Sequence, residues 1–253
     1  MSEWDGATYQ QVSSLQDWLA ERALAGFAFP PGCRVLDIGC GDGRVTARMA
    51  ARLPGSSVVG IDRSAGMLSV APTAERLRFC RADAKHLPFR EAFDVIVSFN
   101  ALHWVSDQQR AMAQIVRVLR RGGRALLVMV GAGQRPSLER VATDVTCEPR
   151  WRRYFVDFAE PFVHPDADRY RRWAAEAGLR VLDLRTEDLS WDFGSASSFR
   201  LWATAGSTAW TSRLPPDAQE PFMADVMTAY RAITGSESTF RFMQLTAELQ
   251  HGE

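Results

Sequence analysis

Three glycines at alternate positions carry the clearest chemical signal in this sequence. Gly39, Gly41 and Gly43 follow a short apolar segment, 34–38, and precede a segment, 44–53, whose apolar residues recur at helical spacing. Strand, glycine turn and helix in that order open a doubly wound nucleotide-binding sheet. Glycines let a backbone approach a ligand closely, and the start of a helix presents free N–H donors to a negative group. The pattern therefore predicts a ligand-binding turn after residue 38.

The spacing of the glycines and a carboxylate before them favour one class of ligand. The dinucleotide fingerprint is G-x-G-x-x-G, whereas this turn reads G-x-G-x-G, with Arg44 at the position of the third glycine. Asp37 lies at the end of the preceding strand, where a buried carboxylate would repel a pyrophosphate but could help to hold an ammonium group. The ligand implied is an amino acid joined to a nucleoside, such as S-adenosylmethionine. A nicotinamide dehydrogenase is the distant alternative, which Arg44 disfavours.

Polar side chains also end the next predicted strands along the chain. Asp62 follows Gly39 by 23 residues, Asp83 ends the third strand and Asn100 ends the fourth. An acid about 20 residues after the glycine turn is the position that binds ribose hydroxyls in such units. In an open α/β sheet, ligands bind outside the carboxyl ends of the strands. We therefore expect these side chains to share one site with Asp37.

Length, composition and charge limit the remaining possibilities. The chain has 253 residues, of which 46% are hydrophobic, and its formal net charge is zero. We expect a single domain with a small-molecule substrate and no footprint for nucleic acid or a membrane. The four cysteines show no metal-ligand spacing, and no metal is expected. Reduced thiols and an acidic N-terminus without an apolar run predict a cytoplasmic protein.

Apolar periodicity predicts alternating strands and helices. The expected strands cover 34–38, 57–61, 77–82, 93–99, 124–130, 179–193 and 238–249. The expected helical segments cover 1–29, 44–53, 65–70, 108–120, 166–177 and 195–235, and 131–165 is expected to be loose. The alternation predicts an α/β fold, a doubly wound parallel sheet with helices on both faces. Its core would span about 30–130, 166–194 and 238–250, and a cap would come from 1–29, 131–165 and 195–235.

Residues 30–130 resemble the class I S-adenosylmethionine-dependent methyltransferase family. The resemblance lies in Val35 to Gly43, Gly60 to Ser64, Ala82 to Phe89 and Leu119 to Gly123. It implies a Rossmann-like sheet of seven strands whose last strand is antiparallel, with S-adenosylmethionine as cofactor and S-adenosylhomocysteine as product.

The same resemblance implies a role for each cofactor-binding residue. Asp62 would take the ribose hydroxyls, and Asp83 the adenine amino group, with the Ala84 N–H nearby. Arg63 and Met67 would flank the adenine. The methionine part would lie against Gly39, Cys40 and Gly41, and Asp37 and Asn100 would complete the site.

A narrower resemblance extends over more of the chain. The segment Phe99 to Asp107 is similar to one in the trans-aconitate and juvenile-hormone-acid methyltransferase branch, as are Trp4 with Tyr9 and the segment from Phe199 through Arg213-Leu214-Pro215. Members of that branch methylate small carboxylic acids to esters. The resemblance therefore implies a carboxylate oxygen as the methyl acceptor.

The candidate substrate residues are Tyr9, His103, Trp104, Trp151 and Arg213. His103 could be a catalytic base or a hydrogen-bond donor, and the competing interpretation is a histidine packed beside Trp104. An aromatic residue in an insert more often packs than binds, whereas an arginine could clamp a carboxylate through two hydrogen bonds.

The chemistry of the acceptor decides what His103 would do. A carboxylate is already ionised near neutral pH, so its methylation needs no general base. A phenol or a carbon acid would need one, and His103 is the best-placed candidate. A non-methylating S-adenosylmethionine-binding protein on the same fold is a further alternative, because fold does not fix function.

Overall fold

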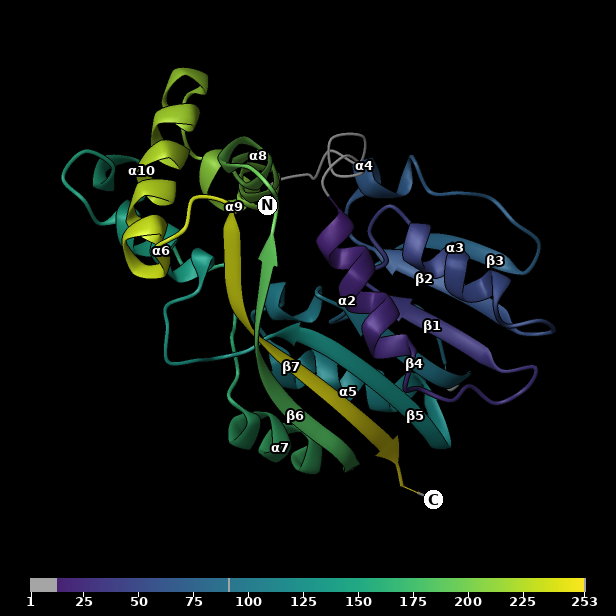
Figure 1. Cartoon of the computed structure of the whole chain (residues 1–253). Helices are drawn as coiled ribbons and strands as arrows, with labels where there is room; N and C mark the ends of the chain where they lie inside the picture. The colour runs from purple at the N-terminus through teal and green to yellow at the C-terminus, as the bar shows by residue number, and fades with distance from the viewer. Residues whose placement is uncertain (1–12, 91, 253) are drawn as a thin grey trace.

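A seven-stranded mixed sheet forms the centre of the molecule (Figure 1). The computed structural model describes residues 13–90 and 92–252. The strands are β1 (Arg34–Ile38), β2 (Ser57–Asp62), β3 (Leu77–Arg81), β4 (Phe93–Phe99), β5 (Leu119–Val130), β6 (Leu179–Asp192) and β7 (Thr239–His251). Their order is β3-β2-β1-β4-β5-β7-β6, and only the pairings of β7 with β5 and β6 are antiparallel. The predicted sheet with an antiparallel last strand is confirmed.

Helices surround this sheet among the described residues. They are α2 (Ser14–Leu24), α3 (Arg44–Ala51), α4 (Ala65–Leu68), α5 (Gln108–Val118), α6 (Leu138–Thr146), α7 (Ala167–Glu176), α8 (Ala196–Gly206), α9 (Thr208–Thr211) and α10 (Pro216–Thr234), with short 3-10 turns η1 (Leu102–Trp104) and η2 (Arg152–Tyr154).

Alternate residues of the central strands belong to two separate hydrophobic cores, one on each face of the sheet. Leu36 of β1 and Ile96 of β4 pack with α5 and α7 on one face. Val35 and Val95 face the other way and pack with Met49 of α3 and with the end of α2. Successive side chains of a strand point to opposite faces, so each of these apolar strands requires cover on both sides. The doubly wound arrangement follows from that requirement.

A third core belongs to the cap elements. The far ends of β6 and β7 extend to one side of the molecule, where α6, α8, α9 and α10 gather around them (Figure 1). Buried residues of these helices pack with Phe240 and Phe242 of β7 and with Leu15 and Leu19 of α2. These elements therefore share a hydrophobic cluster of their own, apart from the two that cover the central strands.

Two local expectations were wrong. Segment 131–165 is not loose throughout, because α6 occupies part of it. The Ser137 hydroxyl accepts a hydrogen bond from Arg140 N at 3.1 Å and caps this helix, and Leu138, Val141 and Val145 line its buried face. The helix expected over 108–120 ends at Val118, and β5 already begins at Leu119.

The helix α2 contacts both the sheet core and the cap. Ion pairs join Arg48 of α3 to Asp17 and Glu21 of α2, and Arg52 also pairs with Glu21. The Arg44 guanidinium donates to the Ser13 hydroxyl just before α2. The helix that follows the glycine turn is thereby tied to the helix whose other face enters the cap.

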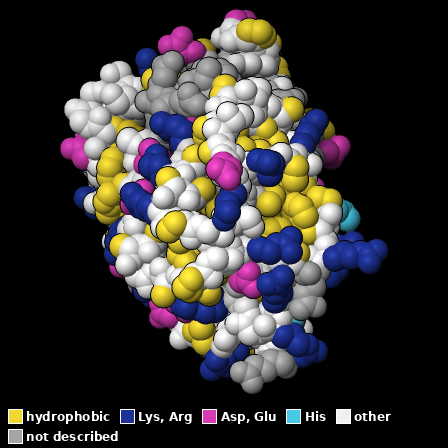
Figure 2. Space-filling view, turned by 90° about the vertical axis from the view of Figure 1, so that its right-hand side faces the viewer, with side chains coloured by type: hydrophobic (Ala, Val, Ile, Leu, Met, Phe, Trp, Pro, Cys, Tyr) yellow, Lys and Arg dark blue, Asp and Glu magenta, His cyan; other side chains and the backbone are white. Residues whose placement is uncertain are grey.

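Charges of both signs are distributed over the surface. On the face that Figure 2 shows, arginine and lysine side chains are numerous, a few acidic ones lie among them, and apolar side chains are exposed between them. Among the described residues, no helix is both long enough and apolar enough to cross a bilayer.

Candidate cofactor and acceptor site

The glycine turn lies between β1 and α3 and is held against the end of β2. Gly39 N and Cys40 N both donate to the Ile61 carbonyl, at 2.8 and 2.9 Å. Gly39 has φ +76°, and a β-carbon there would come within 2.1 Å of the Ala101 Cβ. Only glycine fits both the backbone angle and this close approach. The sequence therefore brings the loop after β4 directly against the turn.

Asp62 organises the turn through its carboxylate. Its Oδ2 accepts from Gly41 N at 3.0 Å, and its Oδ1 accepts from Ser64 N at 2.8 Å. Partial burial raises the pKa of Asp62, while these backbone N–H groups act in the opposite direction. Each carboxylate oxygen has a further lone pair, so the group can still accept hydrogen bonds from a ligand.

Asp37 is fully buried, and only one of its two carboxylate oxygens has a hydrogen-bond partner among the described residues. Its Oδ2 accepts from the Thr46 hydroxyl of α3 at 2.6 Å, whereas Oδ1 has no partner among the described residues. Burial raises the pKa of Asp37 to about 7, and the negative charge of Asp62 adds to that shift. A buried carboxylate oxygen without a partner is costly, so a ligand that donates to it would remove that cost.

The residues predicted to surround the adenine lie at the ends of β2 and β3. Met67 of α4 is buried, and its methyl carbon lies 3.7 Å from the point that a Gly41 β-carbon would occupy. Asp83 is partly exposed, and its Oδ1 accepts from Lys85 N at 2.8 Å, in the loop that holds Ala84. Arg63 is exposed, and its carbonyl accepts from Arg81 Nε at 2.8 Å.

Cys40 is buried within the turn. Burial raises the pKa of its thiol, which therefore stays protonated near neutral pH. A β-carbon on Gly60 would come within 3.0 Å of the Cys40 Cβ, so the side chain fills a tight space between the turn and β2. The thiol acts as a small filler.

Asn100 ends β4 in an unusual backbone conformation. Its φ is +53°, a region that asparagine tolerates better than most residues, and its N–H donates to the Val128 carbonyl at 2.8 Å. Both polar atoms of its side chain are buried and have no partner among the described residues. The amide is thus available to a ligand at the carboxyl edge of the sheet.

His103 lies in the short turn η1 that follows. The turn is braced by Gln108, whose amide donates to the Leu102 and Val105 carbonyls at 2.6 and 2.7 Å. The His103 imidazole is 97% buried, and its Nδ1 has no partner among the described residues. Burial lowers the pKa of His103 well below its usual value, and nearby His164 adds to that effect. The imidazole is therefore neutral at pH 7.

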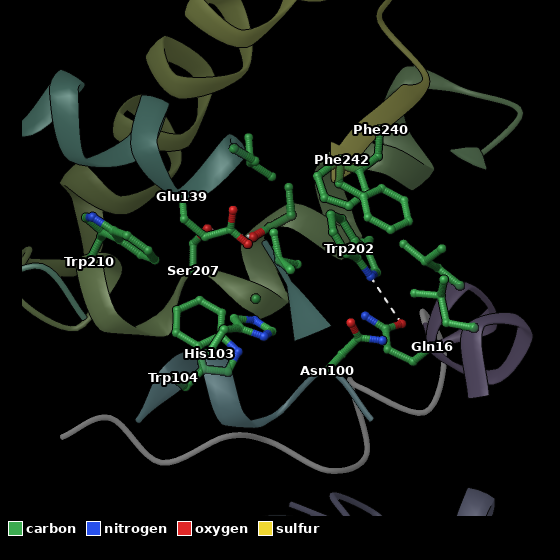
Figure 3. Close-up of a pocket in the computed structure, with 16 residues that line it drawn as sticks. Gln16, Asn100, His103, Trp104, Glu139, Trp202, Ser207, Trp210, Phe240 and Phe242 are labelled. Atoms are coloured by element: carbon green, nitrogen blue, oxygen red, sulfur yellow. Dashed lines mark hydrogen bonds between the residues drawn. The ribbon is translucent and has the colours of Figure 1, made fainter. Parts of the chain in front are cut away.

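A pocket opens beside Asn100 and His103 and leads into the cap (Figure 3). Its volume is about 80 Å³. One water needs about 10–15 Å³ on such a measure, so the space admits several heavy atoms of a ligand. The walls come from the loop after β4, from α2, from the cap helices and from β7: Gln16, Trp104, Glu139, Trp202, Ser207, Trp210, Phe240 and Phe242 are among them.

Two predicted substrate residues lie outside the lining of this pocket. Trp151 is buried in the cap core, where its indole N–H donates to Asp225 at 2.9 Å and its ring packs edge-on against Phe222. Arg213 donates to the Val156 carbonyl at 3.3 Å and lies over the Phe158 ring. Both have packing partners instead. Tyr9 lies outside the described residues, as does Trp4.

Sequence reasoning missed most of the pocket walls. Glu139 belongs to α6, whose serine cap and apolar spacing were present in the sequence and would have identified the helix. Trp202, Phe240 and Phe242 come from segments more than 100 residues beyond Asn100. No local pattern connects those segments to β4, because only the packing of the cap brings them together.

The family of the chain follows from this site together with two sequence comparisons. A profile of the methyltransferase domain matches residues 36–127, the stretch that contains the glycine turn, Asp62 and His103. A trans-aconitate 2-methyltransferase from Variovorax paradoxus is 30% identical over 238 residues, covering 89% of this chain and 88% of the relative. The chain belongs to the S-adenosylmethionine-dependent methyltransferases. The class I family resemblance and the enzyme class predicted from the sequence are confirmed.

Two further proteins similar to this chain are named for different acceptors. A malonyl-[acyl-carrier protein] O-methyltransferase from Geobacter sulfurreducens is 31% identical over 192 residues, covering 72% of this chain and 69% of the relative. A structure of phosphoethanolamine N-methyltransferase 2 from Haemonchus contortus, in complex with phosphomonomethylethanolamine and S-adenosylhomocysteine, has a TM-score of 0.62 at 18% identity. It covers 97% of this chain and 57% of that one. That likeness shows the shared fold.

Proposed function

We propose that this methyltransferase uses S-adenosylmethionine to methylate a carboxylate oxygen of a small molecule. The observation that carries the proposal is a set of unpartnered buried groups at one sheet edge. Asp37 Oδ1, the Asn100 amide and His103 Nδ1 all lack a partner among the described residues. Asp37 and Asn100 lie at the carboxyl ends of β1 and β4, and His103 follows in η1, beside the glycine turn.

The donor set fits the cofactor. Asp62 would hold the ribose hydroxyls with its remaining lone pairs, and Asp37 would accept from the ammonium of the methionine part. Gly39, Cys40 and Gly41 would line that part, Arg63 and Met67 would flank the adenine, and Asp83 with the Ala84 N–H would take its amino edge. S-adenosylmethionine, when bound, supplies a methyl group on a positively charged sulfur that an oxygen lone pair can displace.

The residues of the chain act mainly by positioning. Holding donor and acceptor in line for a displacement can supply roughly 7–11 kcal/mol of the barrier. The Asn100 amide N–H₂ group, which is unpartnered, would orient the acceptor at the sheet edge. The apolar walls of the pocket would exclude water from the reacting groups.

Two lines of support favour a carboxylate oxygen. One relative, matched over 89% of this chain, is named a trans-aconitate 2-methyltransferase, and another, matched over 72%, is named a malonyl-[acyl-carrier protein] O-methyltransferase. The segment Phe99 to Asp107, which forms η1 and the floor of the pocket, carries the resemblance to the branch that methylates small acids. Trp104 would form a wall against the acceptor.

The second candidate is methylation of a phenol or a carbon acid with His103 as base. It is favoured by one observation, the neutral and unpartnered imidazole at the pocket floor. A neutral imidazole is the form that accepts a proton. An alternative of a different kind is a protein that binds S-adenosylmethionine without transferring its methyl group.

One experiment separates these functions. Purified protein is incubated with S-adenosylmethionine and panels of small acids, phenols and amines, and S-adenosylhomocysteine is measured. We expect turnover with members of the acid panel and a methyl ester product. Turnover only with phenols would favour the second candidate, and tight cofactor binding without turnover in any panel would favour the non-methylating alternative.

A further inference from the structure

The pocket beside Asn100 and His103, here called the acceptor pocket, has an acidic side chain and no basic one in its described lining, although the proposed acceptor is an anion. Among the described lining residues there is one acid, Glu139, and there is no lysine or arginine. The undescribed stretch 1–12 contains no lysine or arginine in its sequence either. Carboxylate recognition in proteins commonly uses an arginine fork. A simple anion would therefore meet a negative charge here without a compensating cation from these parts of the chain.

Glu139 differs from an ordinary acid in the first turn of a helix. Such acids stabilise the helix while facing water, as Asp168 does in α7, where its side chain is 83% exposed and pairs with Arg171. Glu139 instead points into the pocket (Figure 3). Its Oε2 is buried and has no partner among the described residues. This oxygen is placed to accept from a ligand.

The two histidines at this wall of the pocket do not neutralise Glu139, and the nearby Arg140 pairs with Glu160 instead. The rings of His103 and His164 lie 5.8 Å apart, and His103 Nδ1 and His164 Nε2 are both buried without described partners. Burial lowers the pKa of both histidines. Neutral imidazoles bring no positive charge to the carboxylate, and each offers a ring nitrogen that can accept or donate one hydrogen bond.

Much of the pocket wall consists of aromatic rings, which attract a cation more strongly than aliphatic side chains do. Trp202 and Phe240 pack at a centroid distance of 4.7 Å, and Trp210 stands edge-on to Trp104 at 6.2 Å. Aromatic faces attract cations within about 6 Å of the ring centre. Elsewhere in the molecule arginines lie over Trp151, Trp173 and Phe158, among other rings. No described arginine lies over Trp202, Trp210, Phe240 or Phe242.

We propose that the acceptor carries a protonated amine, which binds among the aromatic rings of the pocket against Glu139. This inference rests on the proposed function and narrows its substrate class to small amino-carboxylates with an apolar body. Figure 3 shows Asn100 and Glu139 on different sides of the pocket. The carboxylate end would lie at the Asn100 amide, on the cofactor side, and the ammonium end at Glu139. Positive and negative groups would then alternate along the site, from the cofactor sulfonium to the acceptor carboxylate, the acceptor ammonium and Glu139.

The test measures the binding of three matched probes to the full chain saturated with S-adenosylhomocysteine. The probes are 2-phenylethylamine, 2-phenylethanol and 3-phenylpropanoate, followed by calorimetry or by the fluorescence of the pocket tryptophans. We expect the amine to bind at least ~10-fold more tightly than the acid. We expect Glu139→Gln to weaken amine binding by ~10-fold or more and to leave the alcohol unchanged.

Matched variants make the result specific to the pocket. Asp168→Asn also removes a carboxylate from a first helical turn, and it should leave amine binding unchanged. Glu139→Asp keeps the charge and should retain the preference for the amine over the acid. If Glu139→Gln does not fold, the comparison of the three probes on the wild-type protein still decides.

The possible outcomes distinguish a failure of the amine proposal from a failure of the proposed methyl transfer. Tighter binding of the acid, equal amine binding by wild type and Glu139→Gln, or no amine binding at millimolar concentration would each overturn the inference. The methyl transfer proposal fails separately, when S-adenosylhomocysteine does not bind or no panel compound is methylated. Methylation of acids that lack an amine, together with no amine binding, would retain the function and reject the amine.

Discussion

The proposed cofactor edge, at the carboxyl ends of β1, β2 and β4, and the proposed acceptor pocket are built in different ways. At the cofactor edge, the backbone places each group: Asp37, Asp62 and Asn100 end three neighbouring strands, and backbone N–H groups hold the Asp62 carboxylate. In the pocket, side chains from α2, α6, α8, α9 and β7 converge from distant parts of the sequence. The first arrangement depends on the sheet, and the second depends on how the cap packs.

Asp62 should produce the largest change at the cofactor edge. We expect Asp62→Ala to lower S-adenosylhomocysteine affinity by ~100-fold or more, because two ligand hydrogen bonds to a charged group, at about 1.5–3 kcal/mol each, would be lost together with the support of Gly41. Calorimetry measures the affinity, and circular dichroism checks the fold. Asp94→Ala is the matched control, because Asp94 accepts from Arg34 N at the opposite end of the sheet. Unchanged affinity in a folded Asp62→Ala protein would remove Asp62 from the site.

Asp37 should make cofactor binding depend on pH. Its ionised form is the one that attracts an ammonium, so S-adenosylhomocysteine affinity should rise as pH increases through about 7. We expect Asp37→Asn to lack this rise and to bind ~10-fold or more weakly at pH 8. Titrations between pH 5.5 and 8 measure both effects. A pH dependence that persists in the variant would assign it to another group.

The Asp37 carboxyl should also make stability depend on pH, but with the opposite sign to its effect on cofactor affinity. The folded-state pKa of about 7 exceeds the unfolded value near 3.9, so the folded chain binds the additional proton in this window. The free energy of unfolding of the ligand-free protein should therefore fall as pH rises from about 4 to about 7. Denaturant unfolding across this window would show a smaller decrease in Asp37→Asn. An equal decrease in both proteins contradicts the assignment.

A cap substitution should change stability and spare the cofactor edge. Asp225 accepts from the Trp151 indole N–H and from Arg150, both at 2.9 Å. We expect Asp225→Ala to lower the free energy of unfolding by about 1–3 kcal/mol, because the buried indole N–H would lose its partner. S-adenosylhomocysteine affinity should stay within ~2-fold of wild type. The double variant with Trp151→Phe should cost less than the sum of the two single changes.

His103 should give the smallest effect if a carboxylate is the acceptor. His103→Gln keeps a hydrogen-bonding side chain but loses basicity, so turnover at saturating cofactor should stay within ~3-fold of wild type. The turnover rate should also be nearly flat from about pH 6 to 9. A loss of ~100-fold or more with intact cofactor affinity would indicate general-base catalysis instead. The acceptor would then be the phenol or carbon acid of the second candidate.

The polar groups of the proposed cofactor edge could be identified in the sequence because their placement depends on local geometry. Gly39 and Asp62 each sit at a strand end, and the order of strands in an open sheet brings such ends together. Trp151 and Arg213 had the right residue types for a substrate site, yet Asp225 and Phe158 engage them within the cap. Nothing in the spacing of a sequence distinguishes an aromatic residue that packs from one that lines a cavity. Glu139 was missed with its helix, although the Ser137 cap was readable.

The position of α2 has a kinetic consequence. One side of this helix carries Asp17 and Glu21, which pair with arginines of the helix after the glycine turn, and the other side supplies Leu15, Gln16 and Leu19 to the pocket. A ligand that shifts α2 at one site therefore changes the wall of the other. By linkage, such an effect must be reciprocal. Double-reciprocal initial-rate plots should then intersect away from the horizontal axis, and saturating S-adenosylhomocysteine should change the dissociation constant of an acceptor analogue.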